Sequence, residues 1–177
     1  MSATTILRDV RITMRDGVQL SADIWIPAAG KEHPTILEVL PYRKDDYHRS
    51  ADDELMGAVA RRGYAGCRLD VRGTGRSDGI ALDEYTEDET LDMLEVISWL
   101  RTQPWSNGRV AAWGWSYGGF TSLMAAARRP EGLVAIVPCY ASDDRWEDDV
   151  HPHESPAVMT IPMIVLAFGS VFGGMAM

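Results

Sequence analysis

The chain has 177 residues, of which 46% are hydrophobic, which is enough for one soluble globular domain with its own core. Its 26 acidic residues outnumber its 17 basic ones, so its net charge is −9. A surface this negative repels phosphate backbones, and we expect no nucleic-acid partner. The acidic residues gather at Asp83–Asp92 and Asp143–Asp149, and charge runs of this kind are usually solvated surface.

The cysteines and the N-terminus indicate a reducing compartment. Cys67 and Cys139 each lie in an apolar run and form no C-x-x-C pair, which favours buried free thiols. Residues 1–5 lack a basic segment followed by an apolar core, so we expect no signal peptide. The sequence therefore predicts a cytoplasmic protein, and we expect neither a cofactor nor a metal site. It leaves the oligomeric state open.

The first predicted elements are the two strands of an antiparallel hairpin. Apolar residues alternate between Ile6 and Ile12 and again between Leu20 and Ile26, with an Asp-Gly turn at residues 16–17 between them. A β-branched run at Thr35–Leu40 then suits a buried strand.

From Thr35 onward, predicted strands and helices alternate. Helices are expected at Asp53–Arg62, Thr86–Arg101 and Tyr117–Arg129, and strands at Tyr64–Val71, Arg109–Trp113 and Leu133–Val137. Thr86–Arg101 has the strongest helical pattern, with acids in its first turn and apolar residues along one face. Alternation of this kind predicts an α/β fold with a mainly parallel sheet and helices on both faces.

One short motif carries candidate chemistry. Gly114, Ser116 and Gly118 fit the pattern G-x-S-x-G, with a predicted strand running into it and a predicted helix running out. Such a serine sits at the tip of a strained turn, where side chains two residues before and after it would collide, so both positions are glycine. We therefore interpret Ser116 as the nucleophile of a serine hydrolase. The alternative is an ordinary glycine-rich turn.

A serine hydrolase also needs hydrogen-bond donors for the oxyanion of its tetrahedral intermediate. The backbone N–H of Tyr117, which follows the nucleophile, is one candidate. The second is expected in the loop after Thr35–Leu40, where Tyr42 offers its phenol O–H. Composition alone favours a packing role for Tyr42, since most tyrosines are structural.

Five motifs follow one another in an order typical of one hydrolase family. They are Met14–Leu20, Pro41–Lys44 (Pro-Tyr-Arg-Lys), Asp70–Ser77 (Asp-Val-Arg-Gly-Thr-Gly-Arg-Ser), Gln103–Gly108 and Gly114–Gly119. In these motifs, and over roughly residues 5–151, the chain resembles the Xaa-Pro dipeptidyl-peptidase-like α/β-hydrolases of the CocE/NonD type. That family includes cocaine esterase, α-amino acid ester hydrolases and cephalosporin acylases.

The resemblance implies an α/β-hydrolase fold, an acyl-enzyme mechanism, and a small ester, amide or peptide as substrate. In this family the tyrosine of the Pro-Tyr motif and the N–H after the serine form the oxyanion hole. Those positions are Tyr42 and Tyr117. The resemblance therefore implies that Tyr42 is an oxyanion donor, in place of the packing role that composition alone favours. We interpret the signature loop Arg72–Ser77 as structural.

The sequence shows no plausible Asp–His pair after Ser116. This fold orders its triad as Ser, Asp or Glu, then His, and the resemblance implies that the Asp and His follow a helical cap. His33 and His48 precede the serine, while His151 and His153 follow it with no further strand to deliver them. We therefore expect a C-terminally truncated hydrolase whose Asp and His lie beyond Met177. The alternative is a catalytically incomplete fragment or binding remnant.

The predicted domain organisation has two parts. Residues 1–150 form the N-terminal part of the catalytic domain, and residues 151–177 form an apolar tail at the start of a helical cap. Within it, the 21 residues 157–177 carry no charge, which is long enough to span a bilayer. Three interpretations remain: a truncated or frame-altered cap segment, a buried helix on the sheet, or a membrane anchor. We expect no anchor, because the rest of the chain is typical of a soluble enzyme.

Overall fold

The computed structural model describes residues 4–142. The chain divides into two units, Met1–Ala141 and Ser142–Met177, and the described residues belong almost entirely to the first. The predicted boundary near residue 150, the acidic run Asp143–Asp149, His151, His153 and the apolar tail all lie outside the described residues.

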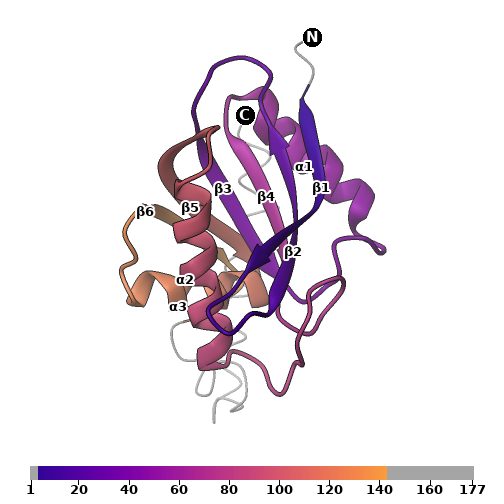
Figure 1. Ribbon diagram of the computed structural model, residues 1–177, viewed down its shortest axis with the longest axis vertical. Coiled ribbons are helices and arrows are strands. Elements are labelled where there is room, and N and C mark those ends of the chain that lie inside the picture. The colour runs from indigo at the N-terminus through magenta and orange to yellow at the C-terminus, as the bar shows by residue number, and fades with distance from the viewer. Residues whose placement is uncertain (1–3, 143–177) are drawn as a thin grey trace, which may run out of the picture. The chain divides into compact units, whose positions relative to one another are not determined.

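Six strands form one mixed sheet within the described part of the chain (Figure 1). They are β1 (Thr5–Thr13), β2 (Gln19–Ile26), β3 (His33–Leu40), β4 (Ala65–Asp70), β5 (Ser106–Trp115) and β6 (Leu133–Cys139). The order across the sheet is β1-β2-β4-β3-β5-β6. The pairs β1–β2 and β2–β4 are antiparallel, and the remaining neighbours are parallel. This is the α/β fold, with an N-terminal hairpin, that the sequence predicts.

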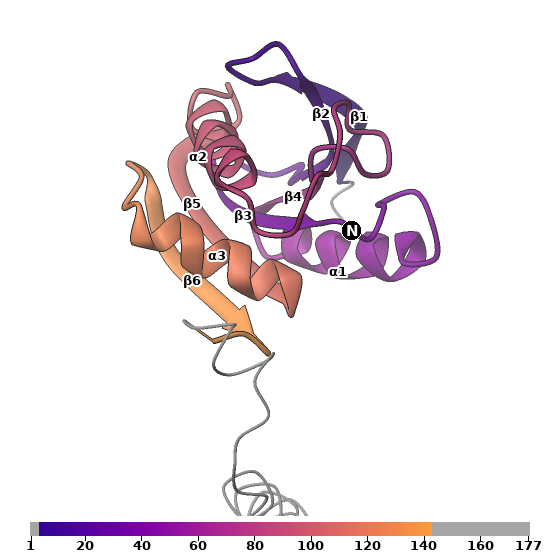
Figure 2. The ribbon, with the colours of Figure 1, turned by 90° about the horizontal axis from the view of Figure 1, so that it is seen from below.

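The helices begin and end close to their predicted positions. They are α1 (Arg49–Arg61), α2 (Glu87–Arg101) and α3 (Tyr117–Ala127). The largest difference is at α1, which begins four residues before the predicted Asp53 and ends where Gly63 takes a positive φ of 88°. Its first turn has Ala51 as its only apolar residue, too little for an apolar pattern to reveal it. Figure 2 shows α1 and α2 on opposite faces of the curved sheet.

The apolar core is correspondingly divided between the two faces. The larger cluster joins alternating residues of β2, such as Leu20 and Ile24, to Val96 and Leu100 of α2. A smaller cluster lies beneath α1 and consists of Trp25, Met56 and Ala60, with Trp113 packed against it. The helix α3 contributes Tyr117 and Ala125 to the larger cluster, so the start of α3 is anchored in the core.

The acidic run Asp83–Asp92 is only partly the solvated surface that its composition predicts. Asp83, Glu84, Glu87 and Asp88 are exposed, but Glu89 and Asp92 are buried, with exposed fractions of 9% and 3%. Both buried carboxylates have partners that a charge count does not reveal. Asp92 binds the guanidinium of Arg72 at 2.7 and 2.8 Å. The prediction that this run is solvated surface is therefore wrong for Glu89 and Asp92.

Candidate active site

Ser116 lies in the sharp turn between β5 and α3, the position that the G-x-S-x-G pattern predicts. Its backbone has φ 50° and ψ −110°, a strained conformation for a residue with a side chain. Its N–H donates to the carbonyl of Cys139 at the end of β6 over 2.8 Å. Its carbonyl accepts the N–H groups of Gly119 and Phe120 at 2.9 and 3.1 Å. Neighbouring backbone therefore holds the strained turn at both of its ends.

Two glycines make this turn sterically possible. A Cβ at Gly114 would lie 2.6 Å from Cα of Gly118, nearer than real Cβ atoms approach. A Cβ at Gly118 would lie 2.7 Å from Cδ2 of Leu40 and 3.4 Å from the carbonyl oxygen of Val39. The strand entering the turn and the helix leaving it thus touch backbone to backbone. The helix also packs closely on the end of β3.

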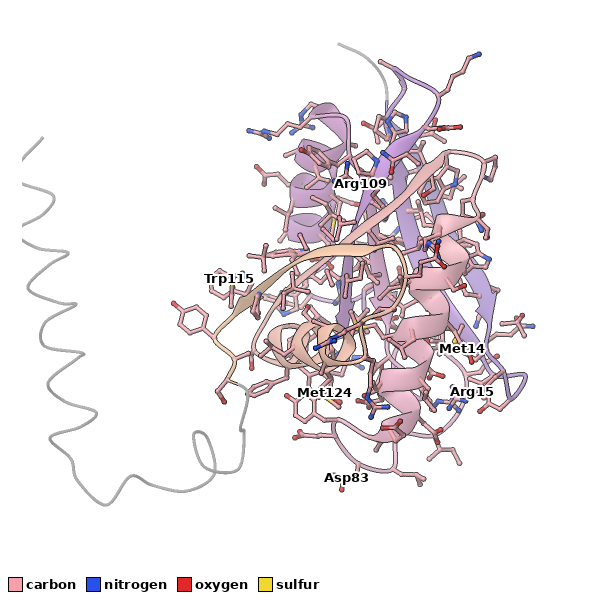
Figure 3. All side chains as sticks on the ribbon, turned by 90° about the vertical axis from the view of Figure 1, so that its left-hand side faces the viewer. Met14, Arg15, Asp83, Arg109, Trp115 and Met124 are labelled. Carbon is pink, nitrogen blue, oxygen red and sulfur yellow. The ribbon has the colours of Figure 1, made fainter. Side chains whose placement is uncertain are left out.

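The surface beside Ser116 is open and aromatic. Ser116 itself is exposed, and the preceding Trp115 is 54% exposed. Its ring lies 5.1 Å from the ring of Tyr140, measured between centroids. Figure 3 shows Trp115 projecting outward on the side of the molecule away from α2. An apolar substrate group would therefore find a contact surface next to the candidate nucleophile.

The two candidate oxyanion donors are the first residue of α3 and a residue of the loop after β3. Tyr117 is the first residue of α3, and in residues 4–142 its N–H has no acceptor, as expected at a helix N-terminus. Tyr42 follows β3, which pairs in parallel with β5 through Leu37 and Ala112. The carboxyl ends of both strands therefore meet at the same edge. Tyr42 is 42% exposed, so its side chain is not buried in the core.

The loop that carries Tyr42 is anchored by Lys44, two residues further along the chain. The N–H of Lys44 donates to Oδ1 of Asp70 over 2.7 Å. The ammonium is only 1% exposed, and three carboxylates surround it: those of Asp9, Asp23 and Asp45, at 2.6, 3.1 and 2.8 Å. This cluster ties the Pro-Tyr-Arg-Lys motif to the N-terminal hairpin, because Asp9 and Asp23 belong to β1 and β2.

The carboxylate of Asp70, which accepts the N–H of Lys44, also holds the glycine-rich loop Arg72–Ser77. Oδ2 of Asp70 accepts the N–H of Arg76 over 3.2 Å, and a Cβ at Gly75 would lie 2.1 Å from that oxygen. Burial raises the pKa of Asp70 above its ordinary value, while the two backbone N–H groups oppose the rise. These contacts agree with a structural role for the loop, since they join it to the loop of Tyr42. Sequence reasoning missed Asp70 and Lys44, although both belong to the motifs that it used.

The two described histidines have other contacts than the candidate nucleophile. His33 is 5% exposed, and its Nδ1 is 3.2 Å from the carbonyl oxygen of Gly63. His48 occupies the N-cap of α1, with its ring centroid 6.3 Å from that of Tyr42. Neither hydrogen-bonds to Ser116, so residues 4–142 supply no histidine base in this structure.

The described part of the chain contains both cysteines, and neither forms a disulfide. Cys67 is a buried free thiol, and burial raises its pKa to about 12, whereas Cys139 is free but only half-buried. No three His, Cys, Asp or Glu side chains of residues 4–142 are grouped so as to hold a metal ion. None of the helices in that range is long and apolar enough to cross a membrane.

Comparison with known proteins identifies one family over most of the chain. The model of the X-Pro dipeptidyl-peptidase (S15) family matches residues 16–164. A protein from Mycobacterium bovis named as a serine esterase is 32% identical over 159 residues. Cocaine esterase from a Rhodococcus strain is 35% identical over 143 residues. Each alignment covers 80% of this chain but only 25% of the relative, so the chain spans about a quarter of their length.

A solved structure agrees with these sequence matches. The crystal structure of a CocE/NonD family hydrolase from Staphylococcus aureus superposes with a TM-score of 0.72 at 26% identity. The superposition covers 81% of this chain and 29% of that protein.

A second kind of match is short and involves an unrelated protein. Over 35 residues, the chain is 60% identical to NADH-quinone oxidoreductase subunit L of Mycobacterium tuberculosis. This stretch makes up 20% of the chain and 6% of that subunit. One chain therefore carries similarity to a hydrolase family over most of its length and to a respiratory subunit over a small part.

Proposed function

Because the chain belongs to the X-Pro dipeptidyl-peptidase (S15) family, we propose that it is the nucleophile-bearing part of a serine hydrolase acting through an acyl-enzyme on Ser116. The observation that carries the proposal is the strained backbone of Ser116 between β5 and α3, flanked by two glycines that permit it. The proposed substrate is a small ester, amide or peptide, since relatives of this family are named as esterases and peptidases.

In the proposed reaction, Oγ of Ser116 attacks the carbonyl carbon of the substrate and a tetrahedral oxyanion forms. The N–H of Tyr117 and the phenol O–H of Tyr42 hydrogen-bond to that oxyanion. The leaving group departs with a proton, the acyl group stays on Ser116 as an ester, and water then hydrolyses this ester. No residue of 4–142 is assigned as the general base, because neither described histidine hydrogen-bonds to Ser116.

That last observation favours a second candidate, a hydrolase fold that binds acyl compounds without turning them over. A serine without a base keeps its proton near neutral pH and is a weak nucleophile. Loss of one triad member typically leaves only about 10³–10⁴-fold acceleration over water, which comes from the oxyanion hole and binding. We therefore expect the 177-residue chain to hydrolyse p-nitrophenyl acetate slowly, and to acquire an acetyl group on Ser116.

The test compares three purified proteins: the wild-type chain, Ser116→Ala and Ser98→Ala. Ser98 is an exposed serine on α2 and serves as the matched control. Turnover is followed by p-nitrophenol release, and the acetyl group is located by mass spectrometry. We expect the adduct in the wild type and in Ser98→Ala, and none in Ser116→Ala.

Two outcomes would change the proposal. Acetylation and turnover that Ser116→Ala leaves intact would exclude Ser116 as the nucleophile. Fast turnover that Ser116→Ala abolishes would show that the chain contains a working base. His151 and His153, which lie outside the described residues, would then be the first histidines to mutate.

A further inference from the structure

The side chain of Tyr117 is buried behind the turn that holds Ser116, and it is fixed at its hydroxyl. Tyr117 is only 7% exposed. Its hydroxyl donates to Oε2 of Glu89 over 2.8 Å and accepts the N–H of Tyr85 at 3.2 Å. The rings of Tyr117 and Tyr85 are stacked, with centroids 4.2 Å apart and planes inclined by 27°. The residue after the candidate nucleophile is therefore held by both its ring and its oxygen.

Glu89 is fixed in turn at the beginning of α2. Its N–H donates to the side-chain oxygen of Thr86, the N-cap of that helix, over 3.3 Å. Its carboxylate accepts the N–H of Tyr85 over 3.0 Å, in addition to the hydroxyl of Tyr117. Burial raises the pKa of Glu89, and the bond from Tyr117 opposes that rise. The first turn of α2 thus presents a buried acceptor in one fixed place.

The peptide unit between Ser116 and Tyr117 is consequently held from two directions. On one side, its carbonyl, which belongs to Ser116, accepts the N–H groups of Gly119 and Phe120 of α3 at 2.9 and 3.1 Å. On the other side, the side chain of Tyr117 is bonded to Glu89 of α2. A strained backbone persists only where its surroundings over-determine it, and these two contacts belong to different elements. Releasing the second contact would leave the Tyr117 N–H restrained only by the carbonyl bonds within α3, because the Ser116 carbonyl and the Tyr117 N–H share one planar peptide unit.

We propose that Glu89 and the hydroxyl of Tyr117 are positioning residues for the reaction at Ser116, because they hold the Tyr117 N–H in the direction of the oxyanion. This inference rests on the proposed function. It gives Tyr117 a second role, carried by its side chain, beyond the backbone donor that the sequence indicates. It also makes the first turn of α2 a part of the active site, although Glu89 does not touch the reacting atoms.

Four substitutions separate positioning from packing. Tyr117→Phe removes the hydroxyl and keeps the ring and the backbone N–H. Glu89→Ala removes the acceptor, whereas Glu89→Gln keeps an acceptor oxygen and should restore most of the reactivity. Glu87→Ala is the matched control, because it removes an exposed carboxylate from the same turn of α2, one that pairs with Arg128 and not with Tyr117 or Glu89.

The experiment measures two quantities on the full 177-residue chain. The first is the rate at which a fluorophosphonate ester labels Ser116, a reaction in which an Oγ–phosphorus bond forms, fluoride leaves, and the hydroxyl proton passes to buffer. We expect labelling about 10-fold slower in Tyr117→Phe and Glu89→Ala, since small displacements of a reacting geometry cost that much or more. Glu89→Gln and Glu87→Ala should stay within about twofold of the wild type. The second quantity is hydrogen–deuterium exchange of residues 114–120, which should quicken in the two slow variants alone.

Three results would overturn the proposal, and they can be told apart. Unchanged labelling or unchanged exchange in Tyr117→Phe would show that the hydroxyl positions nothing. A loss that Glu87→Ala shares would report general destabilisation of the first turn of α2. If the wild type labels no faster than Ser116→Ala, the nucleophile assignment itself fails, and the positioning role falls with it. That third result appears in the wild type, before any substitution of Tyr117 or Glu89.

Discussion

At the scale of single residues, the turn at Ser116 depends on contacts too close for any side chain. The strained φ of 50° at Ser116 is paired with the backbone contact between Gly114 and Gly118. A methyl group at residue 114 would have to displace the first turn of α3, and that turn carries the Tyr117 N–H. Because backbone cannot move aside as a flexible side chain can, the cost should appear both in stability and in reactivity.

We expect Gly114→Ala to lower the free energy of unfolding by about 1–3 kcal/mol, the usual range for overpacking a tight site. The same change should also abolish labelling of Ser116. Urea denaturation measures the first effect, and the fluorophosphonate measures the second.

Gly57→Ala provides the control for this prediction. Gly57 lies within α1, and the nearest atom to an added Cβ is Nη1 of Arg61 at 3.4 Å, an ordinary contact. Alanine there should be neutral or stabilise the fold by up to about 1 kcal/mol, since it favours the helix. If both alanines cost the same, the close approach of Gly114 to Gly118 has no special role.

The sequence could predict Ser116 but could not by itself place its partners. Ser116 and Tyr117 belong to the G-x-S-x-G motif itself, so a local pattern was sufficient to single them out. Tyr42 is remote in the chain, and only the parallel pairing of β3 with β5 brings its loop to the same edge. Composition even favoured a packing role for Tyr42, and the family resemblance supplied the assignment. Its role in the oxyanion hole remains a prediction.

At the scale of elements, sequence reasoning also failed to place the partners of two carboxylates of α2. Glu89 and Asp92 were predicted to be solvated and are buried. The run of acids at the start of α2 looks solvated because charge counts ignore direction. Glu89, Asp92 and Val96 recur at helical spacing and share the buried side of the helix. The signal was therefore present in the periodicity. What the sequence could not show is that Arg72 and Tyr117 would be there to bind these carboxylates.

A second buried charge joins three elements beneath α1. Glu38 of β3 lies opposite Arg68 of β4 in the sheet, and their side chains approach to 3.6 Å. Arg68 is shared with Asp52 of α1, at 3.2 Å. Glu38 is only 4% exposed. Burial raises its pKa from 4.5 to about 7, because the attraction of Arg68 is too weak to offset the loss of water.

This raised pKa predicts how stability changes with pH. The folded protein keeps the Glu38 proton up to about pH 7, whereas the unfolded chain releases it near pH 4.5. The folded state binds more protons between these values, so the free energy of unfolding should fall as pH rises through them. The contribution of this group is at most about 3 kcal/mol, since a tenfold change in proton affinity is worth about 1.4 kcal/mol.

Glu38→Gln cannot lose a proton and isolates the effect. We expect the wild type to lose stability relative to Glu38→Gln between pH 4.5 and 7.5, as measured by urea denaturation at several pH values. Parallel stability curves for the two proteins would show that folding does not raise the pKa of Glu38.

At the scale of the whole molecule, the chain carries similarity to two unrelated kinds of protein. The hydrolase relatives align with 80% of it, and the respiratory subunit aligns with 35 residues. The uncharged residues 157–177 lie outside the described part of the chain, and three interpretations of them stay open. These interpretations differ in where the expressed protein should be found.

We expect the expressed 177-residue chain in the supernatant after high-speed centrifugation, because residues 4–142 form a sheet with a core on both faces. Fractionation followed by immunoblotting measures this. A variant ending at residue 142 is the control. Full-length protein that only detergent extracts, beside a shorter variant that stays in the supernatant, would show that residues 143–177 anchor the chain to the membrane.

The bond between Ser116 and Cys139 also has a consequence for how the protein is made. Translation adds roughly 5–20 residues per second, so the segment that becomes β6 leaves the ribosome after the serine does. Until it arrives, the N–H of Ser116 lacks the carbonyl that holds it in the folded protein. A nascent chain that still lacks β6 should therefore carry an unreactive serine. Reactivity toward a phosphonate probe would then mark the moment when β6 joins the sheet.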